Sequence, residues 1–197
     1  FYPGSNVFST GPNGCTFKCT LCQNWEISQN ILSVPEIPMD ILIKRIITSG
    51  SKGIAYTYSE PYIWFETIMD IHKHLKDSDM KAVMVTNGFM EDRPLRELVR
   101  FIDAMNIDIK SLNPHFYKKL CKGSLRPVLN TCETVVKHCH LEITNLLITG
   151  ENDSEKDIID LVDYIATYLG KTIPLHISRY FPRYKMVNNA TPEISLT

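Results

Sequence analysis

Short apolar segments that favour β-strands alternate with longer helical stretches along almost the whole chain. Several of these segments are nearly continuously apolar, which is typical of parallel strands covered on both faces. The predicted strands are residues 7–10, 53–58, 81–86, 105–109, 140–149 and 174–180. The predicted helices are residues 39–49, 62–76, 95–101, 125–138 and 154–168. Six such units joined by right-handed crossovers form either a partial (β/α)6 TIM-like barrel or a doubly wound sheet.

The chain of 197 residues is long enough for one domain with a substantial hydrophobic core. No repeat, low-complexity tract or Gly/Ser/Pro-rich linker divides it. We therefore predict a single α/β domain over residues 1–197. Because the chain starts with FYPG and stops at SLT, we expect it to be the core of a longer protein that is truncated at both ends.

The charge of the chain is nearly balanced, with 21 Lys and Arg residues against 22 Asp and Glu residues. A net charge of −1 argues against a nucleic acid or an anionic membrane as the partner. No apolar run approaches the roughly 20 residues of a membrane span, and no signal peptide is visible. We therefore expect a cytoplasmic protein that acts on a small molecule or another protein.

The loop after the first predicted strand carries three cysteines in the stretch GCTFKCTLCQNW, namely Cys15, Cys19 and Cys22. Functional residues of a β/α barrel lie in such loops, at the C-terminal ends of the strands. A structural zinc site takes four protein ligands, and so does an ordinary iron–sulfur cluster. Three cysteines therefore either recruit a fourth ligand from elsewhere or leave one metal position open for chemistry.

A fourth protein ligand is not evident in the sequence. No histidine occurs before His72, whereas zinc modules usually carry their second ligand pair at a short fixed spacing. The other cysteines, Cys121, Cys132 and Cys139, lack ligand-like spacing. We interpret these three as reduced, mostly buried thiols.

Polar residues follow the second and third predicted strands. In TYSEP, Glu60 offers a carboxylate for an ammonium group, although Ser59 or Glu60 can instead cap the next helix. In VTNGF, Thr86 and Asn87 can hydrogen-bond a ligand, although Asn-Gly alone is a turn signal. We predict a ligand site that includes these residues.

The last three predicted strands add further candidates. Asp108 and Lys110 share one face of an otherwise apolar strand, where they either form a structural ion pair or bind something polar. Ile148, at the end of the fifth strand, is either a wall of a ligand pocket or plain core. His176 and Arg179 on the sixth strand are candidates for the pocket rim or for ordinary structural roles.

The C-x3-C-x2-C triplet in the loop after the first strand of a β/α series resembles the signature of the radical S-adenosylmethionine (SAM) enzymes. The resemblance implies a [4Fe-4S] cluster held by Cys15, Cys19 and Cys22. It also implies that SAM chelates the fourth iron. An electron from the reduced cluster then cleaves SAM, and the resulting 5′-deoxyadenosyl radical abstracts hydrogen from a substrate. Three cysteines are a complete ligand set in that family. The resemblance also implies the partial (β/α)6 barrel rather than the doubly wound sheet, with the cluster and SAM at the C-terminal ends of the strands.

The same resemblance implies which residues contact SAM. Leu21 stands where relatives often have an aromatic residue that packs on adenine, and Glu60 stands where they take the SAM ammonium. The D-x-K of the fourth strand lies in the SAM site of glycyl-radical-activating enzymes. The implied SAM contacts are Leu21, Ser59, Glu60, Thr86, Asn87, Asp108, Lys110, Ile148 and Arg179.

More narrowly, the motifs resemble those of the AmmeMemoRadiSam-system radical SAM proteins, which are often described as pyruvate formate-lyase activating enzyme-like. We therefore expect hydrogen abstraction from a protein or peptide, as in a glycyl-radical activase. The alternatives are radical modification of a small molecule or lipid, and a non-catalytic zinc-binding scaffold that docks partners. The enzyme interpretation also implies an external electron donor of the flavodoxin or ferredoxin type.

Overall fold

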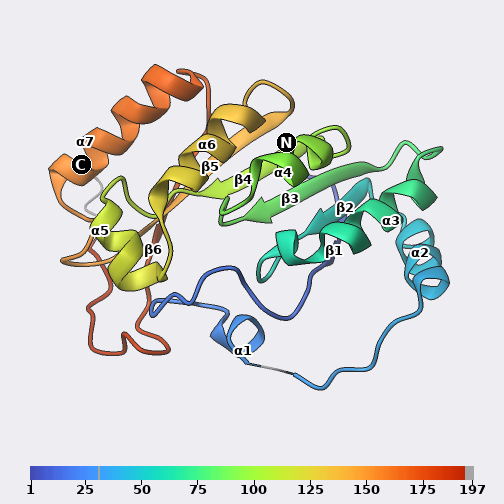
Figure 1. Cartoon of the computed structure of the whole chain (residues 1–197), viewed down its shortest axis with the longest axis horizontal. Helices are drawn as coiled ribbons and strands as arrows, with labels where there is room; N and C mark the ends of the chain where they lie inside the picture. Colours follow the sequence, from blue (N-terminus) through green and yellow to red (C-terminus); the bar gives the residue numbers. More distant parts are fainter. Residues whose placement is uncertain (31, 194–197) are drawn as a thin grey trace.

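The computed structural model describes residues 1–30 and 32–193. Six strands form one sheet in which every neighbouring pair is parallel, and their order in the sheet is their order in the chain (Figure 1). This arrangement confirms the predicted partial barrel and excludes the doubly wound alternative, whose strand order reverses. The strands are β1 (Val7–Thr10), β2 (Gly53–Tyr56), β3 (Lys81–Thr86), β4 (Ala104–Asp108), β5 (His140–Leu147) and β6 (Leu175–Arg179).

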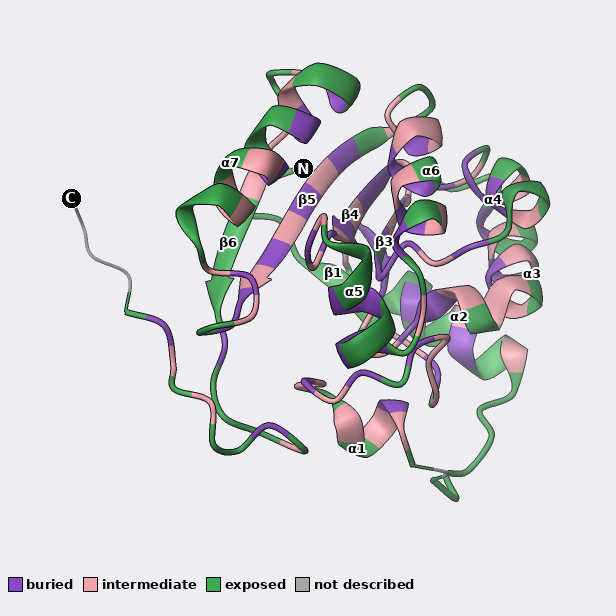
Figure 2. Ribbon diagram, turned by 60° about the vertical axis from the view of Figure 1, so that its left-hand side comes forward, coloured by how far each residue is buried: buried purple, intermediate pink, exposed green. Residues whose placement is uncertain are grey.

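Helices connect successive strands and cover one face of the sheet (Figures 1 and 2). Each long helix buries an apolar stripe, as in α3, where Ile68, Ile71 and Leu75 recur at helical spacing. The α-helices are α1 (Trp25–Ser28), α2 (Met39–Thr48), α3 (Phe65–Leu75), α4 (Asp92–Leu98), α5 (Pro114–Phe116), α6 (Leu125–Val135) and α7 (Glu155–Tyr164). Short helices of other types are the 3-10 helix η1 (Pro61–Trp64) and the π-helices η2 (Tyr117–Cys121) and η3 (Ile165–Leu169).

The two faces of the sheet differ in burial. Along β5 the residues alternate between buried and less buried positions (Figure 2). Leu141 and Ile143 are buried in the hydrophobic core, whereas Glu142 and Thr144 lie on the concave face and are half-buried. The polar positions of the strands therefore line the interior of the barrel, where a ligand can reach them.

The predicted start of the last helix is correct, because a cap residue marks it. Ser154 caps α7 by accepting a hydrogen bond from the Asp157 backbone N–H at 3.2 Å, as expected for a serine before an acidic first turn. The prediction for α4 starts three residues late. Pro94 looks like a boundary in the sequence, but it lies in the first turn of α4, where a missing N–H costs nothing.

The predicted strands at residues 53–58 and 140–149 are each two residues too long, because their last residues already belong to the loops of the candidate site. Among the described residues, no helix is both long enough and apolar enough to cross a membrane.

Candidate functional site

The cysteine loop, residues 11–24, crosses the C-terminal end of the sheet. Gly11 packs so tightly against β2 that an added Cβ would lie 1.9 Å from the carbonyl oxygen of Thr57. Gly14 has a φ of +112°, and its N–H donates to the carbonyl of Ile27 at 2.8 Å. The two glycines therefore hold the loop between the strand ends and α1.

The three cysteines of this loop border one cavity of about 340 Å³ at the C-terminal ends of the strands. The Cys15 sulfur accepts from the Phe17 N–H at 3.4 Å and from Nδ2 of Asn87 at 3.5 Å. The Cys22 sulfur lies 3.0 Å from Oγ of Ser28. Hydrogen bonds to the sulfurs are among the features that tune an iron–sulfur cluster.

The three thiols fit the cluster implied by the sequence. They lie in one cavity, and among the described residues no fourth cysteine lines it. Within residues 1–30 and 32–193, no three His, Cys, Asp or Glu side chains converge on a single metal ion. Burial raises the pKa of the Cys15 thiol to about 12. Because a metal binds the thiolate, loading this site would release protons.

Asp108 and Lys110 border the same cavity and form an ion pair in which Nζ of Lys110 donates to Oδ2 of Asp108 at 2.8 Å. The lysine side chain is 11% exposed and the aspartate side chain 34%. Burial disfavours the charged lysine, but the Asp108 carboxylate together with the neighbouring thiols of Cys19 and Cys121 outweighs burial and raises the pKa of Lys110. The pair is thus a structural ion pair that also presents a carboxylate edge to the cavity.

Glu60 is fully buried and does not line the cavity. Its carboxylate accepts from Oγ1 of Thr86 at 2.6 Å, from the Asn87 N–H at 2.8 Å and from the Tyr62 N–H at 3.1 Å. Burial raises the pKa of Glu60 to about 7, although these three donors oppose the shift. Glu60 therefore caps η1 and also fixes Thr86, the last residue of β3, and Asn87, which follows it.

The structure brings together most of the predicted SAM contacts. Leu21, Ser59, Thr86, Asn87, Asp108 and Lys110 all line the cavity with the three cysteines. Two others lie away from it. Ile148 is buried in the core, with its N–H bonded to Oδ1 of Asn152 at 2.8 Å. Arg179 is exposed, and its guanidinium carbon lies 5.8 Å from the centre of the Phe181 ring.

His176, the other candidate on the sixth strand, pairs with Glu142 instead of lining this cavity. Its Nε2 lies 2.7 Å from Oε2 of Glu142. Sequence reasoning also missed several residues that do line the cavity. Asn24 is one, and its Nδ2 donates to the carbonyl of Tyr58 at 2.6 Å. Thr144 is another, and its alternation with buried residues on β5 was the available signal.

The remaining cysteines lie outside the cavity, as predicted. Cys121 and Cys132 are buried and Cys139 is half-buried, and all three are free thiols. Cys121 packs beside Cys19, and this contact together with burial raises the pKa of the Cys19 thiol.

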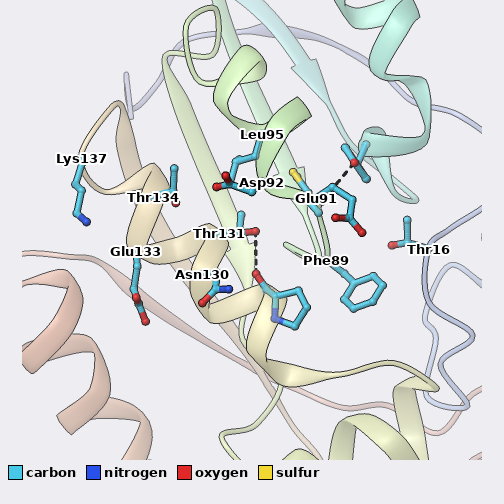
Figure 3. Close-up of a pocket in the computed structure, with 13 residues that line it drawn as sticks. Thr16, Phe89, Glu91, Asp92, Leu95, Asn130, Thr131, Glu133, Thr134 and Lys137 are labelled. Atoms are coloured by element: carbon cyan, nitrogen blue, oxygen red, sulfur yellow. Dashed lines mark hydrogen bonds between the residues drawn. The ribbon is translucent and has the colours of Figure 1, made fainter.

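A second cavity, of about 600 Å³, lies between α4 and α6 (Figure 3). Most of its side chains come from the loop before α4, the two helices and the turn after α6, and Thr16 of the cysteine loop and Tyr62 of η1 also line it. The lining includes Glu91, Asp92, Asn130 and Lys137. These four polar side chains are exposed, and Asp92 pairs with Arg96 at 2.9 Å. The cavity contains no buried charge or thiol and offers no comparable chemistry.

Comparisons with known proteins agree with the geometry of the cysteine cavity. The model of the radical SAM superfamily matches residues 10–162. The chain is 40% identical to an uncharacterised protein of Methanocaldococcus jannaschii over 192 residues, 95% of this chain and 57% of the relative. It is 23% identical to the 4-hydroxyphenylacetate decarboxylase activating enzyme of Clostridium scatologenes over 156 residues, 76% of this chain and 50% of the relative.

Among solved structures, Streptococcus suis SuiB bound to S-adenosylmethionine superimposes with a TM-score of 0.71 at 14% identity, covering 94% of this chain and 44% of SuiB. At that identity the likeness shows the fold alone. The chain spans about half the length of the two curated relatives. The match to the superfamily model covers the cysteine loop and the four strands β2 to β5, so the chain belongs to the radical SAM superfamily.

Proposed function

We propose that this chain is the catalytic core of an enzyme that reductively cleaves SAM. The observation that carries the proposal is the single cavity bordered by Cys15, Cys19, Cys22 and the Asp108–Lys110 pair. Three soft thiolates suit iron, and the two charged side chains beside them suit a zwitterionic ligand. Membership of the superfamily makes a [4Fe-4S] cluster and SAM the natural occupants.

In this proposal Cys15, Cys19 and Cys22 hold the cluster. When bound, the cluster and SAM supply an electron transfer that yields a 5′-deoxyadenosyl radical for hydrogen abstraction. The protein supplies the enclosure and the orientation. Asp108 presents its carboxylate to the ligand, Lys110 fixes that carboxylate, and Leu21 offers an apolar wall. Glu60 positions Thr86 and Asn87, which line the cavity, by accepting hydrogen bonds from them.

For the substrate, we favour a protein or peptide, as in glycyl-radical activation. The sequence similarity to an activating enzyme of Clostridium scatologenes supports a protein or peptide substrate. Radical modification of a small molecule or lipid is the second candidate. The half-buried concave face of the barrel, with Thr144 and Asn106 joined by a 2.7 Å hydrogen bond, offers polar groups to such a ligand.

The test is anaerobic reconstitution with iron and sulfide, followed by SAM and dithionite. We expect the cluster's EPR signal to change when SAM is added, and 5′-deoxyadenosine to form. If the cluster assembles but its EPR signal does not change with SAM and no 5′-deoxyadenosine forms, the proposed SAM cleavage is excluded. Stoichiometric zinc in protein purified without air would instead favour a scaffold.

A further inference from the structure

The surface outside the cysteine loop is basic, although the whole chain has a net charge of −1. Four exposed lysines, Lys18, Lys118, Lys122 and Lys185, lie on the segments that meet there. None of them forms an ion pair with any residue in the ranges 1–30 and 32–193. We refer to these four lysines as the basic face.

Backbone hydrogen bonds bring the basic face together around Cys19. The N–H of Lys18 donates to the carbonyl of Cys121 at 3.0 Å, and Lys122 follows Cys121 in the chain. On the other side of Cys19, the carbonyl of Thr20 accepts from the N–H of Lys185 at 3.3 Å. The cysteine loop, η2 and the segment after β6 therefore meet beside one cluster ligand (Figure 1).

Two neighbouring basic residues differ from the basic face because acidic residues pair with them. Lys119 pairs with Glu151 at 2.9 Å, and Arg183 pairs with Glu26 at 3.4 Å. Among the described residues, the four lysines next to Cys19 therefore keep a positive charge that no ion pair compensates, whereas these two neighbours do not. Such a field attracts an acidic partner and raises its rate of encounter.

We infer that the basic face is the docking surface of an acidic protein that carries one electron. The inference rests on the proposed function, because it takes the cluster at Cys15, Cys19 and Cys22 as the acceptor. One electron leaves the reduced carrier and enters the cluster, and no bond forms and no proton moves. Cys19 lies between the cavity and the basic face, since its side chain borders the cavity while the preceding residue, Lys18, is exposed.

A carrier fits this surface better than an RNA does. The basic face lies outside a cluster ligand, where electrons must enter. Single-stranded RNA is bound on aromatic side chains that stack with its bases. The aromatic rings beside Lys185 are already engaged, because Trp25 and Tyr184 stack on each other with their centres 5.1 Å apart.

The experiment compares the reconstituted protein with Lys18→Glu/Lys122→Glu and with a control, Lys44→Glu/Lys171→Glu. The control changes two exposed lysines on α2 and after η3, which also lack described ion pairs, by the same charge. The first readout is binding of an acidic flavodoxin in 50 and 300 mM salt, with a basic cytochrome c as the comparison probe. The second is the rate of cluster reduction by reduced flavodoxin and by dithionite.

We expect Lys18→Glu/Lys122→Glu to weaken flavodoxin binding and slow its electron transfer by about tenfold or more, as is typical for loss of electrostatic steering. Added salt should weaken binding by the wild type and the control variant, and dithionite should reduce all three equally. Lys118→Glu/Lys185→Glu, which leaves the cysteine loop unchanged, should reproduce the binding defect if the first variant assembles its cluster poorly.

The inference would be overturned if both charge-reversed variants bound flavodoxin and were reduced by it as the wild type is. It would also be overturned if the wild type bound cytochrome c or an RNA oligonucleotide more tightly than flavodoxin. The binding readout separates this inference from the proposed function. SAM cleavage with dithionite but no dependence on the lysines would reject the docking surface alone. Lysine-dependent reduction without SAM cleavage would reject the proposed reaction and keep the docking surface.

Discussion

The cysteine cavity and the cavity between α4 and α6 differ in size, but the more informative difference is in the residues that line them. The cavity between α4 and α6 is the larger, at about 600 Å³ against about 340 Å³, yet exposed helix side chains supply its polar groups. The cysteine cavity lies at the ends of the strands and holds half-buried charges and thiols. Burying a polar group costs folding free energy, so a cavity lined by buried polar groups indicates a functional site better than a large volume does.

The largest expected difference between the cavities is in iron binding. Cys22→Ala should abolish the cluster, because it removes one of three ligands. Cys132→Ala, a buried cysteine on α6, should retain it. Iron and sulfide content with the visible absorbance of the reconstituted proteins gives the result. Loss of the cluster in Cys132→Ala would show that the ligand set is different.

A smaller but clear difference should appear in SAM affinity. Asp108→Asn removes the carboxylate that pairs with the nearly buried Lys110 and faces the cavity. Since a hydrogen bond to a charged group contributes about 1.5–3 kcal/mol, SAM binding should weaken about tenfold to hundredfold. The matched control is Asp92→Asn in the other cavity. Calorimetric titration of SAM should show unchanged affinity there, and equal affinities in both variants would contradict the assigned site.

The pH dependence of stability should reveal the buried carboxyl behind the cysteine cavity. Burial raises the pKa of Glu60 from 4.5 to about 7, so the folded protein holds this proton more tightly than the unfolded chain does. Its contribution to the free energy of unfolding is therefore fully present below pH 4.5. As the pH rises, the unfolded chain ionises first, and the contribution is lost up to about pH 7.

Denaturant titrations across this pH range test the prediction. Glu60→Gln should lack this component, and it should also lose about 1–3 kcal/mol of stability at neutral pH, because an amide NH2 would face backbone donors. Glu91→Gln, an exposed carboxyl at the other cavity, should retain the wild-type profile. Identical profiles for Glu60→Gln and the wild type would show that Glu60 does not titrate in this range.

The smallest effect is expected in the larger cavity. Asn130→Ala truncates an exposed side chain that lines it. Stability should change by no more than about 0.5 kcal/mol, as for most surface substitutions, and the rate of SAM cleavage should not change. A marked loss of 5′-deoxyadenosine formation would make the α4–α6 cavity part of the active site.

The sequence predicted the features that depend on local patterns. The alternation of β-rich and helical segments marked all six strands, and residues at strand ends reach one cavity because parallel strands end at the same edge. The predictions were weaker where tertiary packing decides. The local sequence left open whether Glu60 caps the next helix or faces a ligand, and whether Ile148 packs into the core or faces the cavity; the structure shows the cap and the core position.

In the described part of the chain, β6 is the last strand of the sheet, and most of its residues are exposed. An edge strand presents free backbone N–H and C=O groups to any further strand that can pair with it. The cysteine loop follows β1, at the opposite edge. A further strand can thus extend the sheet at β6, at the edge away from the strand that leads into the cysteine loop.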